Sequence, residues 1–317
     1  IVASPRALNR AANKLCLEDQ AVHGWYRFVL SFPPHLVREY LRRFSVTAEH
    51  LVLDPFCGTG TTLVECKKLG IASVGVEANP MAHFASDVKS DWSPDPDGLL
   101  RHADRVADSA ISQLRVEGIE DISALFLPDR RPNRQLRTLS PEMTKLLLSN
   151  SISPFPLHKT IVLLDCLAQH SDERYYRHEL LALANVIVYS ASNLQFGPEV
   201  GAGPAKIDAP VISTWLTEVR AMSEGIRQVR GRRDVPARVF SADSRKPLEM
   251  FDPQSIDVVV TSPPYPNEKD YTRTTRLESV LLGFIKNQGD LRALKRGLLR
   301  SNTRGVYKGD DDDQWVV

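Results

Sequence analysis

A strand, a glycine-rich loop, a helix and a second strand follow one another between residues 51 and 79, and this succession constrains the fold more than any other feature. Residues 51–53 are an apolar run typical of a short buried strand. Gly58 and Gly60 predict a loop, and residues 61–69 predict a helix that ends at a glycine. The next apolar run stops at Glu77. Such a unit places two strands in parallel, so we expect an α/β fold.

Two later apolar runs extend the predicted sheet to four parallel strands. Residues 237–243 read as a strand that ends at Asp243. Residues 258–260 read as a strand covered on both faces, as in a parallel sheet. Pro263 and Pro264 then end it, because proline donates no backbone hydrogen bond. The resulting stiff loop is either an ordinary strand-ending turn or a ligand site, since open α/β sheets bind ligands at the carboxyl ends of their strands.

The middle of the chain has a different character. Residues 1–90 hold the first half of the predicted sheet and residues 238–317 the second, whereas residues 91–237 are dominated by helical patterns. These patterns lie near residues 99–114, 159–170, 172–193 and 213–229. The Pro- and Gly-rich segments between them, such as residues 196–210, read as loops without strands. We therefore expect a large helical insertion, which serves as a target-recognition module, a scaffold or a dimer contact.

Composition limits the class of protein. The 317 residues are 42% hydrophobic and 25% charged, with a net charge of +1, so a nucleic-acid surface would have to be a local patch. No apolar run is long enough to cross a membrane, and there is no signal peptide. The four cysteines form no CxxC pair, so we expect no metal site and a reduced, cytoplasmic protein. Both ends of the chain look trimmed, and we expect a fragment.

The residues beside the glycine loop indicate the kind of ligand. The loop lacks the Gly-Lys-Ser/Thr ending of a phosphate-binding P-loop, and it is not a GxGxxG dinucleotide motif. Asp54, at the end of the first strand, would repel phosphates and attract a cation. Glu77, at the end of the second strand, is placed to bind ribose hydroxyls. A ligand with a ribose, a positive centre and no phosphate satisfies both acids, and S-adenosyl-L-methionine is such a ligand.

These motifs, taken together, resemble those of the amino-group DNA methyltransferases, which modify N4 of cytosine or N6 of adenine. The segment "WYRFVLSFPPHLV" resembles the cofactor-flanking motif of that family, "LDPFCGTG" its S-adenosylmethionine loop, "VGVEANP" its ribose-acid strand end, "FSADS" its adenine-contacting strand end and "TSPPY" its catalytic loop. The resemblance covers roughly residues 23–90 and 238–285. It implies a Rossmann-like class I methyltransferase sheet of about seven strands. The strands not found here lie either beyond residue 317, which we favour, or within the helical insertion.

The resemblance also implies which residues form the site. The cofactor-binding residues that it predicts are Phe32, Asp54, Pro55, Phe56, Cys57, Gly58, Gly60, Thr61, Glu77, Ala78, Asn79, Asp243 and Thr261. The catalytic residues that it predicts are Ser262, Pro263, Pro264 and Tyr265. For Cys57, as for the other cysteines, packing as a reduced thiol is the simplest interpretation.

The Ser-Pro-Pro-Tyr loop suits methylation of an exocyclic amine, which is a poor nucleophile because its lone pair is delocalised into the ring. Two acceptors, the Ser262 hydroxyl and the Pro263 carbonyl, would bind the hydrogens of the amine and direct the lone pair at the methyl donor. Rigid proline backbone fixes the acceptor in advance. Tyr265 would stack on a base that has been flipped out of the duplex.

The resemblance leaves alternatives open for the substrate. Ser262 before the prolines favours DNA over RNA and, within DNA, cytosine N4 over adenine N6. An RNA guanine-N2 methyltransferase and a non-catalytic DNA- or cofactor-binding subunit are the competing functions. DNA is the expected partner, and the sequence leaves a homodimer open. Basic runs are candidates for phosphate contact or solvated faces. They contain Arg130, Arg131, Arg134 and Arg137; Arg227, Arg230, Arg232 and Arg233; and Lys295, Arg296, Arg300, Arg304 and Lys308.

Overall fold

The chain forms two compact units. The computed structural model describes residues 15–28, 31–121, 135–197, 199–245, 250–264 and 270–299. The described parts of Ile1–Ser93, Gly225–Glu268 and Arg296–Val317 form unit 1, and those of Pro94–Glu224 and Lys269–Lys295 form unit 2. Helix α10 (Ile212–Val229) carries the chain from unit 2 into unit 1. Among the described residues, no helix has both the length and the apolar character that crossing a bilayer requires.

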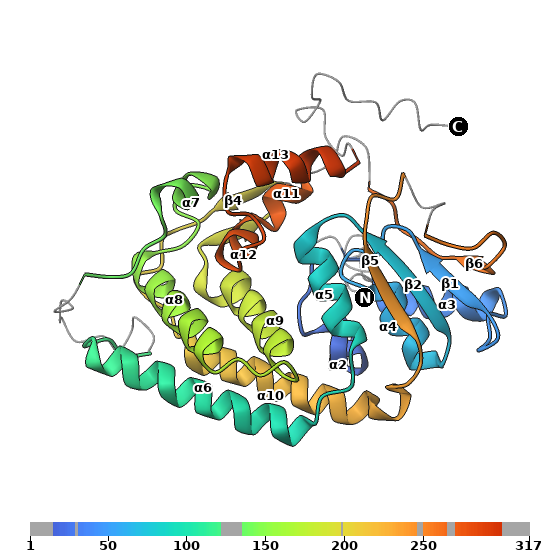
Figure 1. Cartoon of the computed structure of the whole chain (residues 1–317), viewed down its shortest axis with the longest axis horizontal. Helices are drawn as coiled ribbons and strands as arrows, with labels where there is room; N and C mark the ends of the chain where they lie inside the picture. Colours follow the sequence, from blue (N-terminus) through green and yellow to red (C-terminus); the bar gives the residue numbers. More distant parts are fainter. Residues whose placement is uncertain are drawn as a thin grey trace, which may run out of the picture. The chain divides into compact units, whose positions relative to one another are not determined.

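A four-stranded parallel sheet is the centre of unit 1 (Figure 1). Its strands are β1 (Leu51–Asp54), β2 (Ala72–Glu77), β5 (Ala237–Ser241) and β6 (Val258–Val259), in the order β5-β2-β1-β6. Asp54 pairs with Gly75 in the register of β1 and β2, so the carboxyl ends of these strands meet at one edge. This arrangement confirms the predicted α/β class with a Rossmann-like parallel sheet.

Helices of unit 1 pack on the sheet and on one another. They are α2 (Gln20–His23), α3 (Pro34–Arg43), α4 (Thr61–Leu69) and α5 (Pro80–Ser90), with the short turns η1 (Leu17–Asp19) and η4 (Arg230–Arg232). Helix α4 lies between Gly60 and Gly70, whose φ angles of 84° and 82° suit glycine. Helices α3 and α5 begin with proline, whose fixed φ suits a first turn. A core cluster joins α3 to β1 and α4 through Val37, Leu41, Val52, Cys66 and Ile71.

Unit 2 is mainly helical. Its helices are α6 (Pro96–Val116), α7 (Pro141–Leu146), α8 (Pro154–Gln169), α9 (Tyr176–Val186), η3 (Ile187–Ala191), α11 (Tyr271–Thr274), α12 (Arg276–Leu281) and most of α13 (Gln288–Gly297). Helix α6 packs against α8, and α8 against α9. The side chain of Asp95 accepts a hydrogen bond from the Gly98 amide and so caps the start of α6. Whether this unit recognises a target stays a prediction.

Two details of the predicted secondary structure are wrong. Residues 194–202, expected as part of a loop region without strands, form the antiparallel pair β3 (Leu194–Phe196) and β4 (Val200–Ala202). Val258–Val260 was expected to be covered on both faces, but β6 ends the described sheet and the Val259 side chain is 56% exposed. An apolar run predicts a strand, but it does not reveal which neighbours cover that strand.

Candidate active site

Asp54, the last residue of β1, is the centre of the candidate site. Its side chain is fully buried. Oδ2 accepts a hydrogen bond of 2.6 Å from the Thr62 hydroxyl, and Oδ1 accepts one of 2.8 Å from the Thr261 hydroxyl and one of 3.1 Å from the Phe56 amide. These donors come from the glycine loop, the first turn of α4 and the segment after β6. Asp54 therefore holds three segments at one point.

The burial of Asp54 governs its charge. Burial raises the pKa of Asp54, whereas the hydrogen bonds from Thr62, Thr261 and Phe56 oppose that rise by stabilising the carboxylate. No basic side chain is among its hydrogen-bond donors in the described ranges. Neutral donors that orient a carboxylate without neutralising it leave a negative site, which suits a cationic ligand.

The glycine loop is shaped by two residues with left-handed backbone. Gly58 has φ 53° and Gly60 has φ 84°. A Cβ atom on Gly60 would lie 2.6 Å from Ser86 Oγ and 3.1 Å from Ser86 Cα, whereas one on Gly58 would meet nothing within 4 Å. Gly60 is thus required both for its conformation and for close packing on α5. Thr61 follows it as the first residue of α4 and is buried.

Cys57 is a packing residue of this loop. Its thiol is buried, and it lies against Gly75 of β2 so closely that a Cβ atom there would come within 2.7 Å of Sγ. Burial, with the nearby acids Glu77 and Asp54, raises the pKa of the Cys57 thiol well above its ordinary value. A thiol in that state is a poor nucleophile, so the site offers no covalent route through this cysteine.

Glu77, at the end of β2, bridges the two loops beside it. Its carboxylate accepts hydrogen bonds of 2.9 Å from the Gly58 amide and 2.7 Å from the Asn79 amide. Burial raises the pKa of Glu77 to about 7 although both amides oppose the rise, and Asp54 adds to it. A backbone hydrogen bond from Ala78 adds to these two. A carboxylate offers about four acceptor positions, so the group retains the capacity to accept from a ligand hydroxyl.

Asn79 and Ala78 link β2 to α5. The Asn79 side chain is buried and caps α5, because Oδ1 accepts hydrogen bonds from the amides of Met81 at 3.0 Å and Ala82 at 3.4 Å. Ala78 is partly buried between Glu77 and this cap. The visible contacts of Asn79 are therefore structural, and its predicted cofactor contact stays a prediction.

The end of β5 approaches the loop after β1. Ser244 donates a hydrogen bond from its hydroxyl to the Pro55 carbonyl, which brings residues 243–245 beside the glycine loop. Asp243 is bound by its neighbour Arg245, whose Nη2 lies 2.7 Å from Oδ2 and whose Nε lies 3.0 Å from Oδ1. A ligand that contacts Asp243 would therefore meet an ion pair rather than a free carboxylate.

The predicted catalytic loop begins beside Asp54. Thr261 makes the hydrogen bond described above, and Ser262, Pro263 and Pro264 follow it directly, partly or fully exposed. Tyr265 lies outside the described residues. The structure therefore brings the start of this loop to the acid that ends β1.

Phe32 and its neighbour Ser31 contact two different parts of unit 1. Phe32 packs, partly buried, against the core cluster of Val37, Leu41, Val52, Cys66 and Ile71. Ser31 Oγ lies 3.3 Å from Thr59 Oγ1 in the glycine loop. The segment before α3 thus lies against the loop that follows β1.

Sequence reasoning missed Thr62, and it did not reveal the partners of one arginine in the basic runs. The signal for Thr62 was the last threonine of "GTGTT", which is the second residue of a helix that follows the carboxyl end of a strand. Arg137, expected as a candidate DNA contact, binds Glu117 and Asp165 within unit 2. Arg130, Arg131, Arg134, Arg300, Arg304 and Lys308 lie outside the described residues.

The geometry supports binding of a cationic ligand that carries hydroxyl groups. Asp54 and Glu77 end adjacent strands, and Pro55 to Gly60 curve between them. Hydrogen bonds join Thr261 to Asp54, and Gly58 and Asn79 to Glu77. The bond from Ser244 to Pro55 brings Asp243 near the glycine loop. Carboxylates, hydroxyls and backbone amides in this group offer hydrogen bonds and negative charge to a ligand.

Comparison with known proteins finds DNA methyltransferases that are similar to this chain. A family model described as DNA methylase matches residues 10–85. The chain is 25% identical over 309 residues to the type II methyltransferase M.BsoBI of Geobacillus stearothermophilus, a match covering 92% of this chain and 58% of that protein. It is 24% identical over 309 residues to the type II methyltransferase M.AvaI of Nostoc sp., covering 90% and 58%.

A shorter match has a higher sequence identity. The chain is 38% identical over 68 residues to the type II methyltransferase M.MjaII of Methanocaldococcus jannaschii, which covers 22% of this chain and 13% of that protein. No solved structure gives a significant match. The chain spans less than two thirds of the length of M.BsoBI and M.AvaI, 58% in each case. The family model, these relatives and the parallel sheet agree with the motifs, and all of them support the similarity of this chain to the amino-group DNA methyltransferases.

Proposed function

We propose that this chain carries the core of a site-specific DNA methyltransferase that transfers a methyl group from S-adenosyl-L-methionine to an exocyclic amine of a flipped DNA base. The observation that carries the proposal is the hydrogen bond from Thr261 to Asp54. It fixes the Ser-Pro-Pro loop, which would bind the base, to the acid of the loop that would bind the donor. The names of the relatives, type II methyltransferases, support the same activity.

The residues of unit 1 fit S-adenosyl-L-methionine. When bound, this donor supplies an electrophilic methyl group on a positively charged sulfur. Asp54 would attract the cationic part, since its hydrogen-bond donors among the described residues are all neutral. Glu77 would accept hydrogen bonds from ribose hydroxyls. The amino-terminal end of α4, which begins at Thr61, suits the donor's carboxylate because the first amides of a helix favour negative charge.

Two acceptors would prepare the base. The Ser262 hydroxyl and the Pro263 carbonyl would accept hydrogen bonds from the amine of the base, which would turn its lone pair out of conjugation with the ring. The prolines fix the direction of the carbonyl without a cost of reorganisation during the reaction. Tyr265 would stack on the flipped base. Because the reaction is a direct displacement, orientation supplies most of the rate enhancement.

Ser262 favours cytosine N4 over adenine N6 as the methylated atom. This preference rests on the resemblance of "TSPPY" to the catalytic loops of N4-cytosine enzymes. The helical unit 2 follows the donor-binding half in the chain, and we propose it as the carrier of target recognition. A cytoplasmic location and a homodimer stay predictions.

The experiment is methyl transfer from labelled S-adenosyl-L-methionine with the purified protein. The substrates are duplex DNA, tRNA and no nucleic acid, and the Asp54→Ala variant is the control without a donor site. We expect label in DNA only. Nuclease digestion and mass spectrometry of the product then distinguish N4-methylcytosine from N6-methyladenine. Label in tRNA would support an RNA methyltransferase, and donor binding without transfer would support a non-catalytic subunit.

A further inference from the structure

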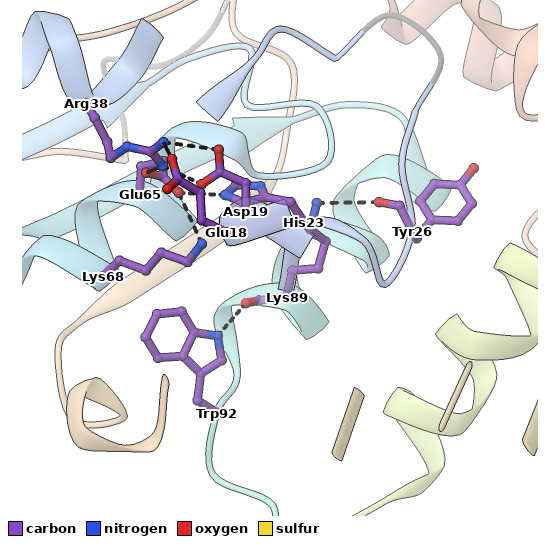
Figure 2. A network of polar contacts seen from close by, with 9 residues as sticks. All are labelled: Glu18, Asp19, His23, Tyr26, Arg38, Glu65, Lys68, Lys89 and Trp92. Atoms are coloured by element: carbon purple, nitrogen blue, oxygen red, sulfur yellow. Dashed lines mark hydrogen bonds and ion pairs between the residues drawn. The ribbon is translucent and has the colours of Figure 1, made fainter. Parts of the chain in front are cut away.

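Five side chains of unit 1 form a connected polar network that the proposed reaction does not use (Figure 2). Asp19, His23, Arg38, Glu65 and Lys68 make up this group, called here the Arg38 network. Arg38 Nη1 lies 2.6 Å from Asp19 Oδ1 and 2.6 Å from Glu65 Oε2, and Arg38 Nη2 lies 3.0 Å from Asp19 Oδ2. One guanidinium therefore joins the turn before α2 to the middle of α4.

The network is buried and its charges balance. Glu65 is fully buried, and Asp19 and His23 are 2% and 3% exposed. The other oxygen of Glu65 accepts from His23 Nε2 at 2.6 Å and lies 3.4 Å from Lys68 Nζ. Burial lowers the pKa of His23 to about 4, so the ring is neutral at pH 7 and donates through Nε2–H. Burial opposes ionisation of Glu65, but His23, Lys68 and Arg38 lower its pKa to about 2.

The network encloses a strained bend. Val22 is a buried β-branched residue with φ 71° and ψ −53°, near the conformation of the rare γ-turn. It lies between Asp19, which Arg38 binds, and His23, which Glu65 binds. A valine holds such a backbone only where the surrounding contacts determine it. The Asp19–Arg38 ion pair on one side of Val22 and the His23–Glu65 hydrogen bond on the other supply those contacts.

The bend leads to the glycine loop by two routes. Along the chain, Tyr26 follows, with its carbonyl 3.4 Å from the buried Lys89 Nζ, and Ser31 then contacts Thr59 of the loop at 3.3 Å. Through space, Glu65 lies on α4, whose first residue follows Gly60. Lys89 is itself fixed beside Trp92, whose Nε1 donates to the Lys89 carbonyl at 2.8 Å. Helix α4 therefore contacts the bend through Glu65 and begins directly after the glycine loop.

We propose that the Arg38 network is a positioning device for the methyl donor: it holds the bend at Val22 so that Ser31 lies against Thr59 of the glycine loop. The inference rests on the proposed function, because it assumes that this loop binds S-adenosyl-L-methionine. Arg38, Glu65 and His23 are positioning residues, since they act on the loop through α4 and the segment before α3.

The test measures binding of S-adenosyl-L-homocysteine by calorimetry and methyl transfer to DNA at saturating S-adenosyl-L-methionine. One variant is Glu65→Gln, which removes the charge and keeps the shape of the side chain. The other is Arg38→Lys, which keeps the charge and removes the planar guanidinium that binds two carboxylates at once. The control for the first variant is Glu39→Gln, at an exposed acid beside Arg38. The control for the second is Arg174→Lys in unit 2, where the exposed guanidinium donates to both carboxylate oxygens of Asp172. We expect Kd to rise about tenfold in the first two variants, ~1.4 kcal/mol, with little change in kcat or in the controls.

A measurement on the wild-type protein keeps the inference testable if both variants fail to fold. Coupling between two sites is reciprocal, so a network that favours donor binding must itself be stabilised by the donor. S-adenosyl-L-homocysteine should therefore slow amide hydrogen exchange in residues 17–28. Unchanged exchange there would overturn the inference.

The outcomes separate the two proposals. If the wild-type protein binds no S-adenosyl-L-homocysteine, the proposed function fails. If it binds while folded Glu65→Gln and Arg38→Lys keep the wild-type Kd, only the positioning role fails. A lower melting temperature with an unchanged Kd shows a purely structural network and also overturns the inference.

Discussion

Thr261 donates a hydrogen bond of 2.8 Å from its hydroxyl to Oδ1 of Asp54, 207 positions earlier in the chain. The acceptor ends β1, and the donor comes directly before Ser262. The bond therefore connects the loop proposed to hold the base with the loop proposed to hold the donor. Its partners lie within one compact unit, so it is part of the frame of the site.

Thr261→Val should weaken both stability and donor binding. Valine has nearly the shape of threonine but no hydroxyl, and the buried Asp54 then loses one of its three donors. We expect a loss of about 1–2 kcal/mol in the free energy of unfolding, with a rise in the donor Kd. Denaturant melts and calorimetry measure the two effects. Thr217→Val, an exposed helix position, is the control, and equal effects in both variants would contradict the role of the bond.

Ser262→Ala should separate chemistry from binding. The hydroxyl is proposed to contact the amine of the base and not the donor. We expect kcat to fall about 100-fold, by analogy with the loss of one preorganised polar contact, while the donor Kd stays at its wild-type value. Single-turnover methylation with saturating DNA measures the chemical step. Transfer at the wild-type rate would show that Ser262 is not an acceptor.

Donor binding should depend on pH through Glu77. Burial raises the pKa of this carboxyl to about 7, above its ordinary value of 4.5. The folded protein therefore holds a proton that the unfolded chain has lost, and the contribution of Glu77 to stability falls as pH rises from about 4.5 to 7. Donor binding has the opposite trend, because the carboxylate is the better acceptor for ribose hydroxyls. We expect the donor Kd to fall between pH 6 and 8.

The control for this pH dependence is Glu77→Gln, which cannot titrate. Its donor Kd should vary less across the same pH range, and any remaining slope belongs to the donor or to other groups. Calorimetric titrations at several pH values give both curves. Parallel curves for the two proteins would rule out Glu77 as the titrating group.

Gly60→Ala and Gly58→Ala form a matched pair. Both positions have positive φ, but only at Gly60 would the new Cβ atom lie within 3.1 Å of a backbone atom, Ser86 Cα. We expect Gly58→Ala to cost about 1 kcal/mol of the free energy of unfolding and Gly60→Ala to cost about 3 kcal/mol or more. Thermal melts of the two variants compare these costs. A smaller loss of stability for Gly60→Ala than expected would mean that Ser86 and α5 move to make room for the new Cβ atom.

Strands β1 and β2 and helix α4 were predictable because the residues that define them are close together in the sequence. Glycines at both ends of α4 fixed its limits at Thr61 and Leu69, and apolar runs located β1 and β2. Parallel pairing then placed Asp54 and Glu77 at the same edge, since successive strands of a βαβ unit point the same way.

What sequence reasoning missed depends on contacts between distant residues. The hairpin of β3 and β4 has strands of three residues each, too short for a clear alternation of apolar and polar residues. The exposure of Val259 depends on which segments lie beside β6. Glu65 was the overlooked signal for the Arg38 network: a single acid between Val64 and Cys66 in an apolar helix predicts a buried partner, although not its identity.

The sheet order has a mechanical consequence. Leu53 of β1 pairs with Val74 of β2 on one side and with Val259 of β6 on the other. The loops proposed to hold the donor and the base therefore follow neighbouring strands, β1 and β6, about 4.8 Å apart. The backbone hydrogen bonds between β1 and β6 therefore couple the positions of the two proposed loops. A small displacement shared by these strands would carry both loops together and preserve the proposed alignment of donor and base.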